Sequence, residues 1–94
     1  MAKLTPAQIK TALNSLSGWK RKGAVISRTY RFKDFVAALR FVNAVGKTAE
    51  KECHHPDIDI RWNKVTLALT THDEGGLTRN DFAMAKKSNA AARL

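Results

Sequence analysis

The chain has 94 residues, of which 44% are hydrophobic and 27% are charged. A protein of this size buries only about 60–65% of the surface that its unfolded form exposes, which allows one layered core. We therefore expect a single domain over residues 1–94, without a second domain or an enclosed cofactor-binding fold. No apolar run approaches the roughly 20 residues that span a bilayer. Residues 1–6 lack the apolar core of a secretion signal, and the single cysteine, Cys53, excludes an internal disulfide. These features favour the cytoplasm.

The net charge of +9 lies entirely in the first half of the chain. Residues 1–49 contain ten basic side chains and one acidic side chain, whereas residues 50–94 contain seven of each. The basic residues are densest at Lys20-Arg21-Lys22. Such a surface attracts phosphates without specificity, but no aromatic RNA-binding run, zinc-finger spacing or glycine-rich clamp accompanies it. We interpret it as a solvated basic face, and binding of nucleic acid or of an acidic protein is the alternative.

Three helices are predicted from their ends and their apolar spacing. Thr5 and Gln8 form a capping box at the start of the first helix, which we expect to end at Gly18. Apolar residues at helical spacing predict a second helix from Asp34 to about Glu52. A second capping box, with Asp81 at its third helical position, predicts a helix that begins after Thr78 and runs through Ala90.

Four strands are predicted between these helices: residues 19–21, 25–32, 57–62 and 65–71. In the third strand Ile58, Ile60 and Trp62 alternate with polar residues, so we expect Trp62 to pack in the core. The resulting order is αββαββα. It favours an α+β fold, in which three helices pack on one face of a four-stranded antiparallel sheet and the other face is left to water or a partner.

Three histidines fall between residues 54 and 72. If Asn63-Lys64 is the two-residue loop of a hairpin, Trp62 pairs with Val65, and the same register places His55 opposite His72. His54 then approaches from the loop that enters the strand. Imidazole has an unperturbed pKa of about 6.5, so neighbouring histidines can divide acid and base roles at neutral pH. Isolated surface histidines are the alternative. A zinc site that includes Cys53 is disfavoured, because adjacent strand residues diverge, and we predict no metal.

The spacing of these residues resembles the signature of the pterin-4a-carbinolamine dehydratases. The matching residues are Glu50, His54-His55-Pro56, Trp62, His72 and Asp81. The resemblance implies the αββαββα fold, a homodimer or homotetramer, and an enzyme that removes water from 4a-hydroxytetrahydropterin. The product is a quinonoid dihydropterin, which a reductase recycles to tetrahydropterin. The resemblance also implies that neither a metal nor an organic cofactor is required.

The same resemblance implies an active site at His54, His55 and His72. The positions of His54 and His72 are the acid/base candidates, and that of His55 holds the pterin. The register argument pairs His55 with His72 instead, so the division of roles stays open. The predicted substrate-binding surface consists of Cys53, Pro56, Thr70, Thr71 and Asp73, with Glu50 and Asp81 as supporting residues. On pattern alone, Asp81 is sufficiently explained as a helix cap, and Glu50 could either orient a histidine or be a solvated helix residue. We expect Cys53 to be a small, buried or half-buried residue.

Two further functions remain open at this stage. The chain could be a binding module with a vestigial pterin site, since some dehydratases also bind a transcription factor as a dimerisation cofactor. It could also act on a different pterin substrate. The sequence identifies no such partner or substrate.

Overall fold

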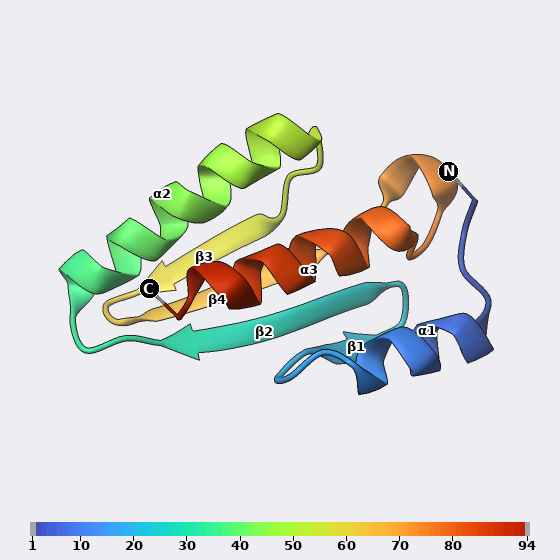
Figure 1. The fold of residues 1–94 in the computed structure, drawn as a ribbon, viewed down its shortest axis with the longest axis horizontal. Coiled ribbons are helices and arrows are strands. Elements are labelled where there is room, and N and C mark those ends of the chain that lie inside the picture. The colour runs from blue at the N-terminus through green and yellow to red at the C-terminus, as the bar shows by residue number, and fades with distance from the viewer. Residues whose placement is uncertain (1, 94) are drawn as a thin grey trace.

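The fold combines three helices with one antiparallel sheet. The structure is a computed structural model that describes residues 2–93. The elements are α1 (Pro6–Asn14), β1 (Lys20–Lys22), β2 (Val25–Arg31), α2 (Phe35–Glu52), β3 (Asp57–Arg61), β4 (Lys64–Leu69), the 3-10 turn η1 (His72–Glu74) and α3 (Arg79–Ala91). The strand order is β1-β2-β4-β3. Helices α2 and α3 lie across one face of the sheet (Figure 1). The predicted α+β fold with the order αββαββα is confirmed.

The helix starts agree with the prediction, and one helix end does not. The Gln8 amide donates to Thr5 Oγ1 over 3.2 Å, and the Thr5 amide donates to Gln8 Oε1 over 2.9 Å, which completes the first capping box. Asp34 caps α2 by accepting from the Ala37 amide at 2.8 Å. Helix α1 ends at Asn14, four residues before Gly18. The Ser15 amide turns back to the Ala12 carbonyl, which ends the regular hydrogen-bonding pattern.

The predicted register of the second hairpin is wrong by two residues. Arg61 pairs with Lys64 and Ile58 pairs with Leu67, so Trp62 and Asn63 form the loop. Asn63 fixes this position, because its side-chain amide donates to the Phe32 carbonyl at 2.8 Å. Position 55 therefore does not lie opposite His72, and the pairing of His55 with His72 is overturned.

The loop also corrects the prediction for Trp62. Its side chain is 68% exposed, and its φ is 51°. Once Trp62 becomes a loop residue, it leaves the strand alternation that would have turned it toward the core. The buried apolar side chains of the sheet lie instead on β2 and β4, and include Ile26, Val65, Leu67 and Leu69.

A buried polar cluster joins α3 to β2 and to the segment before β1. Asn89 Oδ1 accepts from Trp19 Nε1 and Arg28 Nη1, both at 2.9 Å, and from the Tyr30 hydroxyl. Asn89 Nδ2 donates to the Ser17 carbonyl at 3.1 Å. Every polar atom of the Asn89 side chain is thus partnered, which allows it to be buried at this helix–sheet contact.

Burial of Tyr30 predicts how the free energy of unfolding changes at alkaline pH. Burial raises the pKa of its phenol above 10.0, although the hydrogen bond with Trp19 and the Arg28 charge oppose this. The unfolded chain therefore loses this proton at a lower pH than the folded chain does. We expect the free energy of unfolding to fall as pH rises past about 10.

Tyr30 is the only tyrosine, so absorbance of the phenolate reports on it alone. The folded chain should ionise at a higher pH than the same chain in concentrated urea. Coincident titration curves in the two solvents would contradict the prediction.

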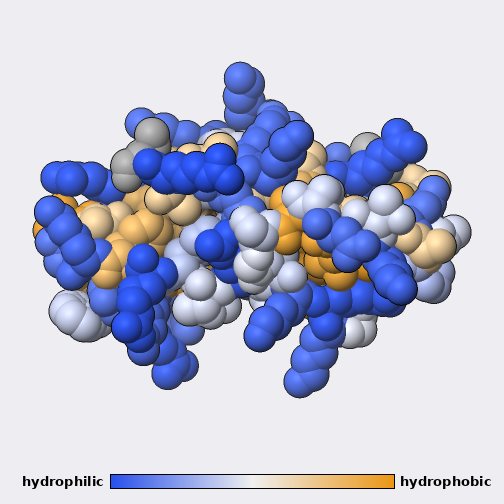
Figure 2. Space-filling view, turned by 60° about the horizontal axis from the view of Figure 1, so that its bottom comes forward, coloured by the Kyte–Doolittle hydropathy of each residue, from blue (hydrophilic) through white to orange (hydrophobic). Residues whose placement is uncertain are grey.

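The surface carries many charged side chains. Figure 2 shows hydrophilic side chains over most of the face that it presents, with hydrophobic surface in smaller areas. All three residues of β1, Lys20–Lys22, are exposed. Within residues 2–93, no helix has the length and apolar character to span a membrane.

Candidate active site

The first two histidines directly follow the end of α2. Cys53 adopts a left-handed conformation with a φ of 53° and ends the helix. The Cys53 amide donates to the Glu50 carbonyl, and the His54 amide donates to the Ala49 carbonyl at 3.1 Å. This is the Schellman arrangement of a helix C-terminus, although a non-glycine residue holds the left-handed position. Cys53 is exposed, which corrects the expectation that it is buried or half-buried.

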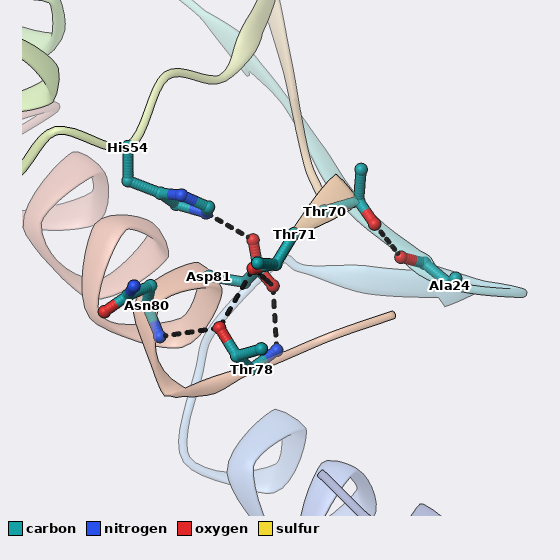
Figure 3. A network of polar contacts seen from close by, with 7 residues as sticks. All are labelled: Ala24, His54, Thr70, Thr71, Thr78, Asn80 and Asp81. Carbon is teal, nitrogen blue, oxygen red and sulfur yellow. Dashed lines mark hydrogen bonds and ion pairs between the residues drawn. The ribbon is translucent and has the colours of Figure 1, made fainter. Parts of the chain in front are cut away.

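His54 contacts a carboxylate that is completely buried. Its Nε2 lies 2.6 Å from Asp81 Oδ1; the His54 side chain is 13% exposed and that of Asp81 is 0% exposed. The other carboxylate oxygen accepts from the Thr78 amide at 2.9 Å and from Thr71 Oγ1 at 2.8 Å (Figure 3). Asp81 therefore caps α3 and contacts His54 at the same time.

The hydrogen-bond directions around Asp81 follow from the donors available. The Asn80 amide can only donate, and it donates to Thr78 Oγ1 at 3.2 Å. Since the Thr71 hydroxyl gives its proton to Asp81, the Thr78 hydroxyl donates to Thr71 Oγ1 across 2.9 Å. An ionised carboxylate accepts only, so His54 donates from Nε2. When the ring is neutral, its lone pair is then on Nδ1, away from Asp81.

His55 forms a second pair at the surface. Its Nε2 is hydrogen-bonded to Glu50 Oε2, and the two side chains are 61% and 79% exposed. The same reasoning places the Nε2 proton between His55 and Glu50. Water screens this pair, so it orients the ring with little gain in stability.

The third histidine lies next to the buried cluster in sequence but outside it. His72 is exposed and begins η1, directly after Thr71. Among residues 2–93 no hydrogen bond joins any two of the three histidines. Because His54 and Thr71 both contact the Asp81 carboxylate, the backbone of His72 lies one residue from that contact.

The predicted substrate-binding residues flank the histidines along the sequence on two segments, 53–56 and 70–73. Asp73 is exposed in η1, and Pro56 is half-buried before β3. Thr70 Oγ1 donates to the Ala24 carbonyl at 2.6 Å, which ties the end of β4 to the β1–β2 loop. The Thr71 hydroxyl is hydrogen-bonded to both Asp81 and Thr78, so its side chain stabilises the site.

A hollow of about 500 Å³ adjoins the Glu50–His55 pair. It lies between α2 and β3, and its lining residues are Val42, Asn43, Gly46, Lys47, Glu50 and Ile58. A second hollow of about 500 Å³ lies between α1 and α3 and is lined by none of the predicted site residues. The volume of the hollows therefore does not select the site, and the buried carboxylate beside His54 identifies it better.

No group of three or more His, Cys, Asp or Glu side chains in the described part of the chain is arranged to hold a metal ion. The carboxylates instead bind individual imidazoles, His54 with Asp81 and His55 with Glu50.

Comparison with known proteins shows the family of the chain. The sequence pattern of the family described as pterin 4 alpha carbinolamine dehydratase matches residues 2–91. The chain belongs to this family. A relative from Acidobacterium capsulatum, provisionally named pterin-4-alpha-carbinolamine dehydratase, is 54% identical over 90 residues, which cover 96% of this chain and 98% of the relative. A protein of Koribacter versatilis with the same provisional name is 51% identical over 86 residues, 92% of each chain.

Two solved structures share the fold. The crystal structure of a transcriptional coactivator/pterin dehydratase from Brucella melitensis has a TM-score of 0.93 and 39% identity, and the match covers 96% of this chain and 98% of that chain. A pterin dehydratase-like protein, described as a RuBisCO assembly factor in the alpha-carboxysome, has a TM-score of 0.67 and 20% identity. That match covers 79% of this chain and 86% of the other. At this identity the second likeness concerns the fold alone.

Sequence reasoning missed two contacts that shape the site. Thr71 was predicted only as a substrate-binding residue, and the hydrogen bond that its hydroxyl donates to the Asp81 carboxylate was not predicted. Sequence reasoning also treated the capping role of Asp81 as a sufficient explanation, but one oxygen caps α3 and the other contacts His54. The only sequence signal for the contact between Asp81 and His54 was that His54, a residue of the motif, had no predicted partner.

Proposed function

We propose that this protein removes water from 4a-hydroxytetrahydropterin by acid/base catalysis through histidine. The observation that carries the proposal is the contact of His54 with the fully buried Asp81 carboxylate at 2.6 Å. A partly buried imidazole held in one tautomer by a buried acceptor is an arrangement suited to general acid/base catalysis. Membership of the dehydratase family supports the same reaction class.

The reaction needs two proton transfers. The leaving 4a-hydroxyl must gain a proton, and the ring nitrogen must lose one as the C=N bond forms. In our proposal the unprotonated Nδ1 of His54 accepts the nitrogen proton, and the imidazolium of His72 donates to the hydroxyl. His55 binds the pterin, with its ring oriented by Glu50.

The remaining predicted residues belong to the same proposed surface. We assign Cys53, Pro56, Thr70, Thr71 and Asp73 to the walls around the pterin, where backbone groups can pair with its polar edge. The dehydration involves no net oxidation or reduction, so it requires no redox cofactor.

The proposed enzyme acts as a homodimer or homotetramer. Helix α2 supports this, because it exposes three large apolar side chains, Phe35 at 46%, Val36 at 55% and Leu39 at 37%. A second copy of the chain would cover these residues and remove them from water.

Decay of enzymatically generated 4a-carbinolamine tests the proposed reaction. We expect the wild-type chain to accelerate formation of quinonoid dihydropterin above the rate in buffer. His54→Ala and His72→Ala should each lower this acceleration about 100-fold or more, because each removes one proton-transfer group. Initial rates of carbinolamine decay measure the effect, and far-UV circular dichroism of each variant checks that it is folded.

Lys10→Ala is the control, since Lys10 is exposed on α1. It should retain the wild-type rate. Equal rates with the wild-type chain and with buffer would overturn the proposed function. Equal rates with the wild-type chain and a His54→Ala/His72→Ala variant would overturn the proposed histidine mechanism.

A further inference from the structure

One row of the sheet places three cations directly opposite one another. Arg31 of β2 pairs with Lys64 of β4, and Lys64 pairs with Arg61 of β3. Directly opposed residues lie on the same face, with Cβ atoms about 4.5–5.5 Å apart, and like charges in these positions destabilise a sheet. All three residues are exposed. Asp59 contacts Arg61 at 3.1 Å, but both side chains are largely exposed, so water screens this pair. The row thus presents several positive charges that an anionic partner would stabilise.

This row lies on the face of the sheet that α2 and α3 leave uncovered. Ile26 and Tyr30 of β2 are buried on the helix side, so the alternating residues Ser27, Thr29 and Arg31 face the other way. Lys20 pairs with Ser27 and extends the positive charge toward the β1 edge of the same face. The centre of the face carries short hydroxyl side chains, including Thr29, which is hydrogen-bonded to its neighbour Thr66 at 2.7 Å. The surface is therefore polar, with the cation row at one end and Lys20 at the β1 edge, whereas the exposed Asp57 and Asp59 lie on the same face along the β3 edge.

An exposed aromatic ring lies at the cationic end. Trp62 follows Arg61 in the β3–β4 loop, and this loop and the end of β2 lie at the same end of the molecule (Figure 1). Asn63 holds the loop in place: it is 7% exposed, its side chain donates to the Phe32 carbonyl, and its own carbonyl accepts from the Phe32 amide, both at 2.8 Å. The 68% exposed Trp62 ring is thus carried on an anchored loop next to the cation row.

We propose that Trp62 and the row Arg31–Lys64–Arg61 bind single-stranded nucleic acid. The cations contact successive phosphates, and an unpaired base stacks on the indole, which is the combination that single-strand binding uses. An acidic polypeptide would use the cations but would have no base to place on Trp62. A duplex keeps its bases stacked inside, so it would use the cations alone. The surface is made of residues outside the proposed dehydratase site, and the proposal does not depend on that activity.

Tryptophan fluorescence gives a direct readout of the stacking. The chain has two tryptophans, and Trp19 is 6% exposed and hydrogen-bonded to Asn89, so a base that reaches an indole reaches Trp62. Titration with a 12-nucleotide oligothymidylate should quench the emission. Anisotropy of a labelled copy of this oligonucleotide should show that Trp62→Ala weakens binding about fivefold or more, and that Trp62→Phe restores it.

A charge-matched pair of variants tests the cation row. Replacement of Arg31, Arg61 and Lys64 by glutamine should weaken binding and make the dependence of log affinity on log salt shallower by about two, as expected for the loss of three phosphate contacts. The control replaces Lys10, Arg40 and Lys86 by glutamine, which removes the same charge from exposed positions on the three helices. This control should retain the steeper dependence.

Several outcomes would overturn the proposal. These are absence of quenching, equal affinity of Trp62→Ala and the wild-type chain, or equal loss of affinity in both triple variants. Equal affinity for poly-aspartate or for a duplex of the same length would show that charge alone is recognised, and would also overturn it. Protection of Trp62 from iodide in the chain without oligonucleotide would show that another copy of the chain covers the ring, with the same consequence.

Discussion

Asp81→Asn should lower the rate of carbinolamine dehydration at least about tenfold. The carboxylate of Asp81 accepts from His54 Nε2, from Thr71 Oγ1 and from the Thr78 amide. An asparagine side chain has one accepting oxygen, so its NH₂ group would face a donor on one side. If the NH₂ group faces His54, Nε2 must accept a hydrogen bond, and the ring proton moves to Nδ1. Nδ1, the atom proposed to act as the base, can then no longer accept a proton. The initial rate of carbinolamine decay measures the effect.

The same variant should also lose stability. Asp81 is 0% exposed, and an unpartnered buried donor costs about 1–3 kcal/mol. Urea unfolding measures this loss. The ¹⁵N chemical shifts of His54 distinguish a role in positioning the ring from a purely structural one, because they report which ring nitrogen carries the proton. Asp59→Asn, on exposed β3, is the matched control and should change both quantities little. A fully active Asp81→Asn chain with an unchanged His54 tautomer would contradict the proposed role of Asp81.

Asn89→Ala should lower the free energy of unfolding by about 3 kcal/mol or more while leaving the site chemistry intact. Its Oδ1 is the acceptor for Trp19, Arg28 and Tyr30, and the first and last of these are buried. Truncation leaves two buried donors, Trp19 Nε1 and the Tyr30 hydroxyl, without this acceptor, and each costs about 1–3 kcal/mol. Asn89 lies eight residues after Asp81 on α3, about 12 Å along the helix, so the rate in native buffer should stay near that of the wild type. Urea unfolding and the dehydration assay measure the two quantities.

Lys86→Ala is the control for this second prediction, because it truncates an exposed residue of the same helix. Its unfolding free energy should change by less than about 0.5 kcal/mol. A loss below about 1 kcal/mol in Asn89→Ala would show that the polar cluster does not hold α3 on the sheet.

Helix starts and the choice of helix or strand were available from the sequence because they depend on local chemistry. The Thr5 and Thr78 capping boxes combine residues three positions apart, and both are present in the structure. Alternating apolar residues placed Ile26, Leu67 and Leu69 on the helix-covered face of the sheet. The fold class follows from such patterns with their order along the chain.

The register of the second hairpin was not available from the same patterns. A shift of two residues leaves every side chain on its original face, since side chains alternate with a period of two. The apolar pattern therefore fits a loop at Asn63-Lys64 as well as the observed loop at Trp62-Asn63. The bond from Asn63 to the Phe32 carbonyl, between residues 31 positions apart, decides between them.

For the candidate site, too, the sequence determined one part and only the tertiary structure decided the other. The residue types and spacing of His54, His55, His72 and Asp81 identified the histidine motif from the sequence alone. The partner of each histidine was decided only when α2, the β4–η1 segment and α3 came together, which buried Asp81 between Thr71 and His54. A buried carboxylate must be satisfied by whichever donors the fold brings near it, and those donors lie 10 and 27 residues away along the chain.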